Sequence, residues 1–246
     1  MDKEELERFQ ASRVVFDGGV VEAVDRSGVR TPEFVSIGTE FINCRFESMR
    51  IDRAGFGAGM NLSTYRGCSF DRTRIKDVGG GLVRFEGCSF RDVVITGWSL
   101  QACDVVDCVF SGTMKSGRGG GSFWGAPQAY LSRQLGKSDN EFRGNDFSGC
   151  ALVGMDFRNG VDLTLQVLPT GPQYVYVQDG LAAVDRAQPM VEAWSDDRNR
   201  AKALGLLEIV RKDLLGRQRQ LFLSNASGWL DLLWPQLCNA LEGVSE

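Results

Sequence analysis

Large apolar residues return at every fifth position along much of the chain. The members of this series are Phe41, Phe46, Ile51 and Phe56, then, after a slip of one residue, Met60, Tyr65, Phe70, Ile75, Phe85, Phe90, Ile95, Leu100, Val105 and Phe110, with Gly80 at the position between Ile75 and Phe85, and finally Phe142, Phe147, Leu152 and Phe157. An α-helix would bring apolar residues back at intervals of three and four, and a half-buried strand at intervals of two. An interval of five fits neither pattern and is typical of a repeat architecture. We therefore predict a repeat-built domain over roughly residues 39–157.

The position two residues before each central apolar residue is mostly small or slim, with Trp98, Asn140 and Asn145 as misfits. Six of the seven cysteines fall in this class: Cys44, Cys68, Cys88, Cys103, Cys108 and Cys150. Each group of five therefore directs one bulky and one small side chain inward, and the other three face solvent. Cysteine at such a position acts as a small buried hydrophobe. A metal site is disfavoured because the chain has no histidine and the cysteines lack the close spacing of metal ligands.

A longer period is superimposed on the first. The stretches YRGCSFDRTRI and FEGCSFRDVVI lie twenty residues apart, which equals four groups of five and indicates four corners in each coil. Cys68, Cys88 and Cys108 are then expected to stack in register, as are Phe70, Phe90 and Phe110. Successive coils would lie one strand spacing apart, about 4.8 Å.

The chain resembles the pentapeptide-repeat family, whose motif has a central Leu or Phe with a small residue two positions before it. NCRFE, GCSFD, GCSFR and GCALV match this motif well, and GNDFS matches it in part. The resemblance covers about half of the chain. It implies a mainly β fold, a right-handed quadrilateral β-helix over residues 36–163, to which we add a C-terminal β-hairpin and an α-helical segment.

The repeat is interrupted in two places. The slip in FGAGMN, between Phe56 and Met60, indicates a shortened corner with a local bulge. The period is then lost over residues 111–139, which we predict to be an insertion made of a flexible KSGRGGGS stretch and a short helix in APQAYLSRQLGK. GRGGG lacks the lysine-serine pair and the strand-to-helix context of a phosphate-binding loop, so we expect a linker. The apolar residues of the insertion either pack back on the rod or form an exposed contact patch. The candidate partner-binding residues are Lys115, Arg118, Phe123, Trp124 and Tyr130.

Both ends of a β-helix need covering, because terminal coils expose unpaired backbone groups. We predict a cap over residues 1–35, with a helix over 2–10 and a hairpin that turns at Asp17-Gly18-Gly19. A second hairpin is expected over 164–180, where LTLQVLPTGPQYVYVQ alternates around two prolines. Residues 185–246 form an amphipathic helical segment. Its apolar residues either cap the rod or pair two copies into a homodimer, as C-terminal elements do in the quinolone-resistance members of the family. The candidates for this cap or dimer contact are Trp194, Leu207, Val210, Trp229, Leu233 and Trp234.

Composition and charge narrow the function. No apolar run is long enough to span a bilayer, and the polar, acidic N-terminal residues are unlike a signal peptide, so we predict a cytoplasmic protein. The net charge of −4 disfavours direct binding of nucleic acid. Catalysis is not expected, because histidine is missing, the core holds all cysteines but Cys238, and no cofactor fingerprint is present.

We therefore predict a non-catalytic scaffold that binds a protein partner, without a cofactor or metal. The alternative comes from the resemblance: family members that imitate duplex DNA bind DNA gyrase and protect it from quinolones or natural poisons. Such mimicry needs a strongly negative rod. Between Ser36 and Phe110, however, nine Arg and Lys stand against nine Asp and Glu.

Overall fold

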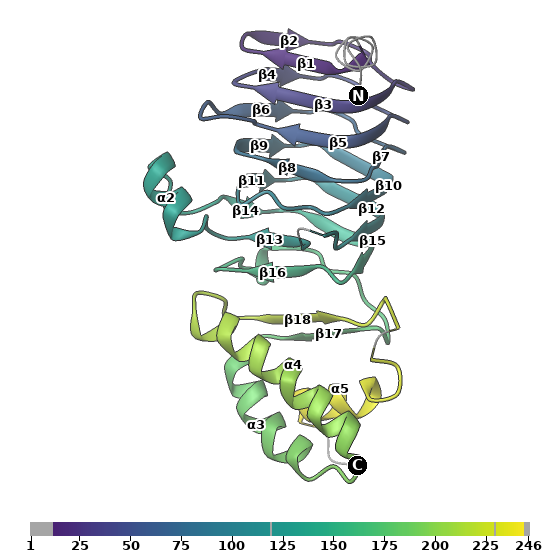
Figure 1. Ribbon diagram of the computed structural model, residues 1–246, viewed down its shortest axis with the longest axis vertical. Coiled ribbons are helices and arrows are strands. Elements are labelled where there is room, and N and C mark those ends of the chain that lie inside the picture. Colours follow the sequence, from purple (N-terminus) through teal and green to yellow (C-terminus); the bar gives the residue numbers. More distant parts are fainter. Residues whose placement is uncertain (1–11, 119, 229, 244–246) are drawn as a thin grey trace, which may run out of the picture.

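The computed structural model describes residues 12–118, 120–228 and 230–243. It shows a rod of stacked parallel strands with a helical unit at its C-terminal end (Figure 1). The predicted mainly β solenoid is therefore confirmed. The helix predicted over residues 2–10 lies outside the described residues.

Two long parallel sheets run along the rod. The strands of the first are, in spatial order, β1 (Val14–Asp17), β3 (Arg30–Ile37), β5 (Arg50–Phe56), β7 (Arg74–Ile75), β10 (Ser89–Thr96), β12 (Val109–Lys115) and β15 (Asp146–Val153), with β8 (Val78–Gly80) also paired to β5. The strands of the second are β2 (Val20–Glu22), β4 (Glu40–Ile42), β6 (Ser63–Arg66), β9 (Leu82–Glu86), β11 (Ala102–Val106) and β14 (Phe142–Arg143). A short parallel pair, β13 (Ser122–Trp124) and β16 (Asp156–Arg158), belongs to the last coils.

Equivalent residues of successive coils are twenty positions apart over most of the rod. Val14 pairs with Phe34 and Phe34 with Ala54 in the first sheet, and Tyr65 pairs with Phe85 in the second. Parallel in-register pairing places like side chains above one another at the strand spacing of about 4.8 Å. The five-residue period of the sequence thus becomes continuous columns of inward side chains.

One such column consists of phenylalanines. The rings of Phe46, Phe70, Phe90, Phe110 and Phe147 follow one another with neighbouring centroids 4.6–5.1 Å apart, and all are fully buried. From Phe70 to Phe147 neighbouring ring planes lie within 8° of parallel. The predicted stacking of three phenylalanines is confirmed and extends to five. Large apolar area and favourable ring contacts make this column the centre of the core.

The cysteines of the repeat are buried free thiols. The Cys44 and Cys88 sulfurs lie 3.3 Å from the carbonyl oxygens of Val21 and Tyr65, so each thiol can donate to the coil before it. Burial raises the pKa of the Cys88 thiol well above its ordinary value and that of Cys150 to about 12. These thiols fill space and satisfy backbone groups rather than react.

The cap predicted over residues 1–35 is wrong in its described part. β1 and β2 do not pair with each other as a hairpin; they pair in parallel with β3 and β4 and form the first coil. The five-residue period is not visible in this part of the sequence, because polar residues stand at the positions that hold large apolar residues elsewhere in the repeat. These polar residues are Arg26, Thr31 and Ser36. The Thr31 hydroxyl lies 2.9 Å from the Ser12 carbonyl oxygen, and the Ser36 hydroxyl accepts from the Gly57 N–H at 2.9 Å. These hydrogen bonds satisfy the buried hydroxyls.

The corner after Phe56 is longer, not shorter, than a standard corner. Phe41 pairs with Tyr65, so equivalent residues are twenty-four positions apart here instead of twenty. Met60, which continues the spacing in the sequence, is 53% exposed and is not part of the core. The extra residues form an outward bend in which Gly57 and Gly59 adopt positive φ angles.

The insertion is shorter than the predicted 111–139. β12 continues the first sheet, with a register shift that moves the inward residue to Met114. Phe123 is 1% exposed and stacks on Phe157 at 5.3 Å, so it is a core residue and not a contact residue. The glycine-rich turn allows close approach of coils: a Cβ on Gly121 would lie 2.5 Å from the Met155 sulfur. Among the described residues of the predicted insertion, the segment that leaves the rod is 125–140, with helix α2 (Ala129–Leu135).

An antiparallel ribbon closes the rod. Its strands are β17 (Tyr174–Val177) and β18 (Leu221–Ser224), separated in sequence by two helices. The C-terminal antiparallel pair was expected, but a local hairpin within 164–180 was wrong. A 3₁₀ turn at Leu163–Leu165 precedes Val167, which extends the first sheet by a parallel bridge to Asp146. The prolines thus lie between the rod and the ribbon.

Buried glutamines complete the last coil. The side-chain oxygen of Gln218 accepts from the N–H groups of Gly160 and Val161, at 3.1 Å each, and its amide donates to the Val161 carbonyl at 2.9 Å. Phe222 of the ribbon packs edge-on against Phe157 at 5.6 Å. The Gln218 side chain therefore satisfies backbone groups of Gly160 and Val161 that the end of the rod would otherwise leave unpaired.

The helices lie on the other side of the ribbon (Figure 1). They are α3 (Gly180–Glu192), α4 (Asp197–Leu215) and α5 (Trp234–Glu242). Leu207, Val210, Leu233 and Trp234 are buried in a core that this unit shares with the ribbon, and Trp194 packs at its edge. Trp229 lies outside the described residues. The buried candidates stabilise the unit that covers the rod, and they have no surface left for a second copy; the homodimer stays a prediction.

The aromatic column predicts a large cost for truncation. Phe90→Ala is expected to lower the free energy of unfolding by about 3–5 kcal/mol, because a fully buried ring between two stacked neighbours leaves a cavity. Guanidinium titration followed by circular dichroism measures this change. Val20→Ala, at an exposed position of β2, is the control and should shift stability by less than about 0.5 kcal/mol. Similar losses for both variants would contradict the proposed core.

Thiol reactivity tests the buried column independently. In the native protein one thiol, Cys238, is expected to react with Ellman's reagent, and slowly, because it is half-buried and burial raises its pKa to about 11. All seven cysteines should react in guanidinium. The variant Cys238→Ala is expected to show no native reaction. Rapid labelling of two or more thiols in the native state would show that the rod is not closed.

Candidate functional site

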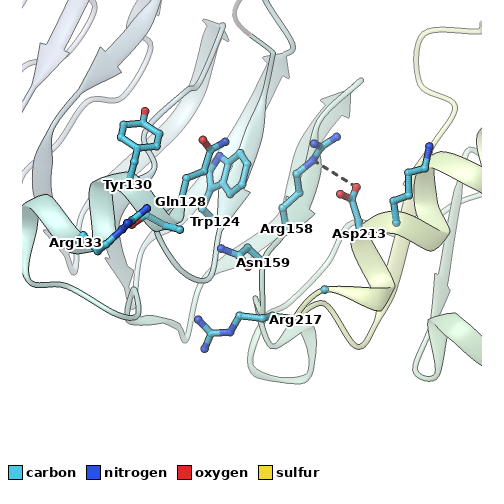
Figure 2. A pocket seen from close by; sticks show the side chains of 11 residues that line it. Trp124, Gln128, Tyr130, Arg133, Arg158, Asn159, Asp213 and Arg217 are labelled. Carbon is cyan, nitrogen blue, oxygen red and sulfur yellow. Dashed lines mark hydrogen bonds and ion pairs between the residues drawn. The ribbon is translucent and has the colours of Figure 1, made fainter.

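A cleft of about 580 Å³ lies where three parts of the molecule meet (Figure 2). We call it the junction cleft. It is lined by residues within 124–133, by Arg158 and Asn159 of the last coil, and by residues within 212–217 at the end of α4. The three segments are remote in sequence, and two of them are where the five-residue period stops.

The loop that forms one wall is held at its base by the rod. It leaves after the Gly125 N–H donates to the Arg158 carbonyl at 2.8 Å and returns where the Asn140 N–H donates to the Gly125 carbonyl at 2.9 Å. The Asn140 amide also donates to the carbonyls of Gln101 and Trp124, at 2.7 and 2.8 Å. This explains why asparagine replaces a small apolar residue here: it ties both ends of the loop to the rod.

A second asparagine fixes the floor of the cleft. Asn159 has a φ of 56°, a conformation that asparagine tolerates better than most residues. Its side-chain amide donates to the Ala126 carbonyl at 2.8 Å. The last coil therefore holds the first residues of the loop, and Trp124 and Tyr130 also line the cleft (Figure 2).

An ion pair joins the loop to the helical unit. Arg217, just after α4, pairs with Asp139 at the end of the loop, and its guanidinium also lies 3.4 Å from the Ser138 carbonyl oxygen. The hydrogen bond from Arg217 lowers the pKa of the Asp139 carboxyl. Both partners are more than half exposed, so the pair contributes little to global stability. Its effect is local, because it links the end of the loop to the residue that follows α4.

The cleft carries more positive than negative charge. Arg133, Arg158, Lys212 and Arg217 line it, against the single carboxylate of Asp213. The Arg158 guanidinium lies 2.7 Å from Asp156 and 3.7 Å from Asp213, and Figure 2 shows Arg158 and Asp213 facing each other. Burial raises the pKa of the Asp213 carboxyl although Arg158 opposes this change. Lys212 and Arg217 also have carboxylate partners just outside the lining, Glu208 and Asp139, so Arg133 is the one lining cation that forms no ion pair among the described residues.

The side chains available here suit binding better than acid–base chemistry. Tyr130 is 56% exposed, Trp124 is half-buried and Arg133 is exposed. Trp, Tyr and Arg are the residue types that most often dominate protein–protein binding energy. Among the described residues no group of three or more His, Cys, Asp or Glu side chains could hold a metal ion.

The structure places the five predicted contact residues in three different environments. Trp124 and Tyr130 line the junction cleft, whereas Lys115 and Arg118 are exposed on the rod beside the glycine-rich turn and Phe123 is buried. Arg133, Arg158, Asn159 and Arg217 were missed. The three arginines could not be chosen from the sequence, because nothing local distinguishes them from other solvent-exposed arginines. Asn140, which stands where the repeat has a small or slim residue elsewhere, did mark the point at which the loop returns to the rod.

Comparison with protein-family models, with curated proteins and with solved structures finds no match to this chain. Within the described ranges, none of the helices is both long and apolar enough to cross a membrane.

Removal of the ion pair between the loop and the helical unit is expected to change the hydrogen exchange of the loop. Asp139→Asn should speed amide hydrogen exchange over residues 126–138 by up to about fivefold, since an exposed pair is worth about 0.2–1 kcal/mol. Hydrogen exchange with mass spectrometry measures this. Glu208→Gln, which removes an equally exposed partner of Lys212 on α4, is the matched control and should leave the loop unchanged. Equal rates in Asp139→Asn and the unaltered protein would contradict the role of the pair.

Proposed function

We propose that the chain is a non-catalytic binding protein of the pentapeptide-repeat type, which holds a protein partner at the junction cleft. The observation that carries the proposal is that Trp124, Tyr130 and the unpaired Arg133 line one cleft. The rod acts as a rigid support, and the loop and the helical unit provide the contact surface. A partner segment with acidic and aromatic or aliphatic side chains fits this chemistry.

The charge of the rod supports this function over DNA mimicry. A rod that imitates duplex DNA needs a continuous negative face. Several carboxylates of the rod are instead paired with arginines of the same or a neighbouring coil, for example Glu47 with Arg45 and Arg72. Protection of DNA gyrase is therefore the second candidate, supported only by the sequence resemblance.

Site-specific photo-crosslinking tests the proposal. A benzophenone amino acid at Tyr130 should capture a partner of one defined mass in cells that carry the natural gene, and the same group at Val20, at the far end of the rod, should not. Adding Arg133→Glu to the Tyr130 probe should reduce capture by about tenfold if the partner is acidic. Equal capture at both positions, or none at Tyr130, would contradict the junction cleft as the contact surface.

A supercoiling assay with purified DNA gyrase and a quinolone addresses the alternative. Protection or inhibition at micromolar protein would replace the scaffold proposal with gyrase binding.

A further inference from the structure

A row of three arginines lies across the first sheet, away from the junction cleft. Arg30 of β3 pairs in register with Arg50 of β5, and Arg50 with Arg74 of β7. All three side chains are exposed and lie on the outer face of the sheet. Like charges directly opposite on neighbouring strands destabilise a sheet. The row is therefore a local cost to folding.

Other arginines of the rod avoid this cost by pairing with acids in adjacent coils. Arg66 pairs with Glu40, Arg84 with Asp104, and Arg143 with Asp107. In the part of the chain that the structure describes, the side chains of Arg30, Arg50 and Arg74 make no hydrogen bond or ion pair. The repeat offers carboxylates at outward positions elsewhere, so a column of unpaired arginines is a departure from the usual pattern of this rod.

The three side chains line a groove of about 280 Å³ together with Ile51, Asp52 and Lys76. Ile51 is buried and forms the floor. The Lys76 ammonium lies 2.6 Å from the Asp52 carboxylate, so the only acid of the groove is already neutralised. The arginine row is thus an uncompensated charge of about +3 in a shallow, narrow groove.

From this geometry we propose that the arginine row binds a short linear polyphosphate group. Guanidinium groups match phosphate oxygens with paired, charge-assisted hydrogen bonds. Three strands at about 4.8 Å spacing give a row about 10 Å long, which suits a few linked phosphate groups lying parallel to the rod axis.

The size of the groove limits the ligand. Beyond Arg74 the next residue in register is Val94, so the positive stripe stops after three coils. Tight binding of nucleic acid requires more phosphate contacts than such a stripe provides. The site is separate from the junction cleft and from the proposed partner.

The test compares two variants, each of which replaces one arginine of β5 by glutamine and so removes one positive charge. Arg50→Gln removes the centre of the row, whereas Arg53→Gln removes an exposed arginine of β5 that lies 3.9 Å from Glu33. By titration calorimetry at low salt, inorganic tripolyphosphate should bind the unaltered protein and Arg53→Gln alike, and Arg50→Gln at least about tenfold more weakly. No binding to the unaltered protein at millimolar tripolyphosphate, or equal losses in both variants, would overturn the proposal.

Thermal unfolding distinguishes a ligand-binding role of the arginine row from a purely structural one. Without ligand and at low salt, Arg50→Gln should be at least as stable as the unaltered protein, because like-charge repulsion is relieved. Tripolyphosphate should raise the melting temperature of the unaltered protein and of Arg53→Gln only. A large destabilisation by Arg50→Gln, with the ligand-induced rise retained, would refute the site.

Further ligands identify the source of the phosphates. Binding of both tripolyphosphate and ATP, without binding of adenosine, supports recognition of the triphosphate in either form. Binding of tripolyphosphate alone supports an inorganic ligand. Tighter binding of a short single-stranded DNA than of tripolyphosphate would overturn the proposal in favour of nucleic acid.

Discussion

The in-register stacking of one coil on the next is the constraint on which the rest of this molecule depends. It places each inward side chain directly over its equivalent in the coil before, which is why Phe46, Phe70, Phe90, Phe110 and Phe147 form one column. Inward volume is conserved along such a column, and departures must be compensated locally. The same stacking also aligns the outward residues of successive coils. Where these residues are charged, they form rows of either opposite or like charges.

The core of the rod could be predicted from the sequence because five-residue spacing and twenty-residue register are both visible in it. The first coil could not, since Thr31 and Ser36 hide the period and are satisfied by backbone groups that only the folded chain brings close. The limits of the insertion were missed for another reason. A register shift at Gly112 interrupts the five-residue spacing of inward side chains, although the chain stays in the rod until Gly125.

The junction cleft was less predictable than the rod. Trp124 and Tyr130 could be chosen because they interrupt a polar, glycine-rich segment, but their partners come from distant parts of the sequence. Arg158 resembles any outward arginine of the repeat, and Arg217 resembles any residue after a helix. Long-range contacts, such as the pair between Asp139 and Arg217, decide which charged side chains share a surface, and no local pattern records them.

The buried glutamine after α4 has a consequence for growth of the rod. A stack of parallel coils ends in an edge that could recruit the edge of another molecule. The Gln218 side chain accepts hydrogen bonds from the N–H groups of Gly160 and Val161, as a neighbouring strand would. The two strands of the ribbon that follows, β17 and β18, pair with each other. Polymerisation through this end is therefore blocked by hydrogen-bond saturation rather than by charge, and so the block persists at high salt.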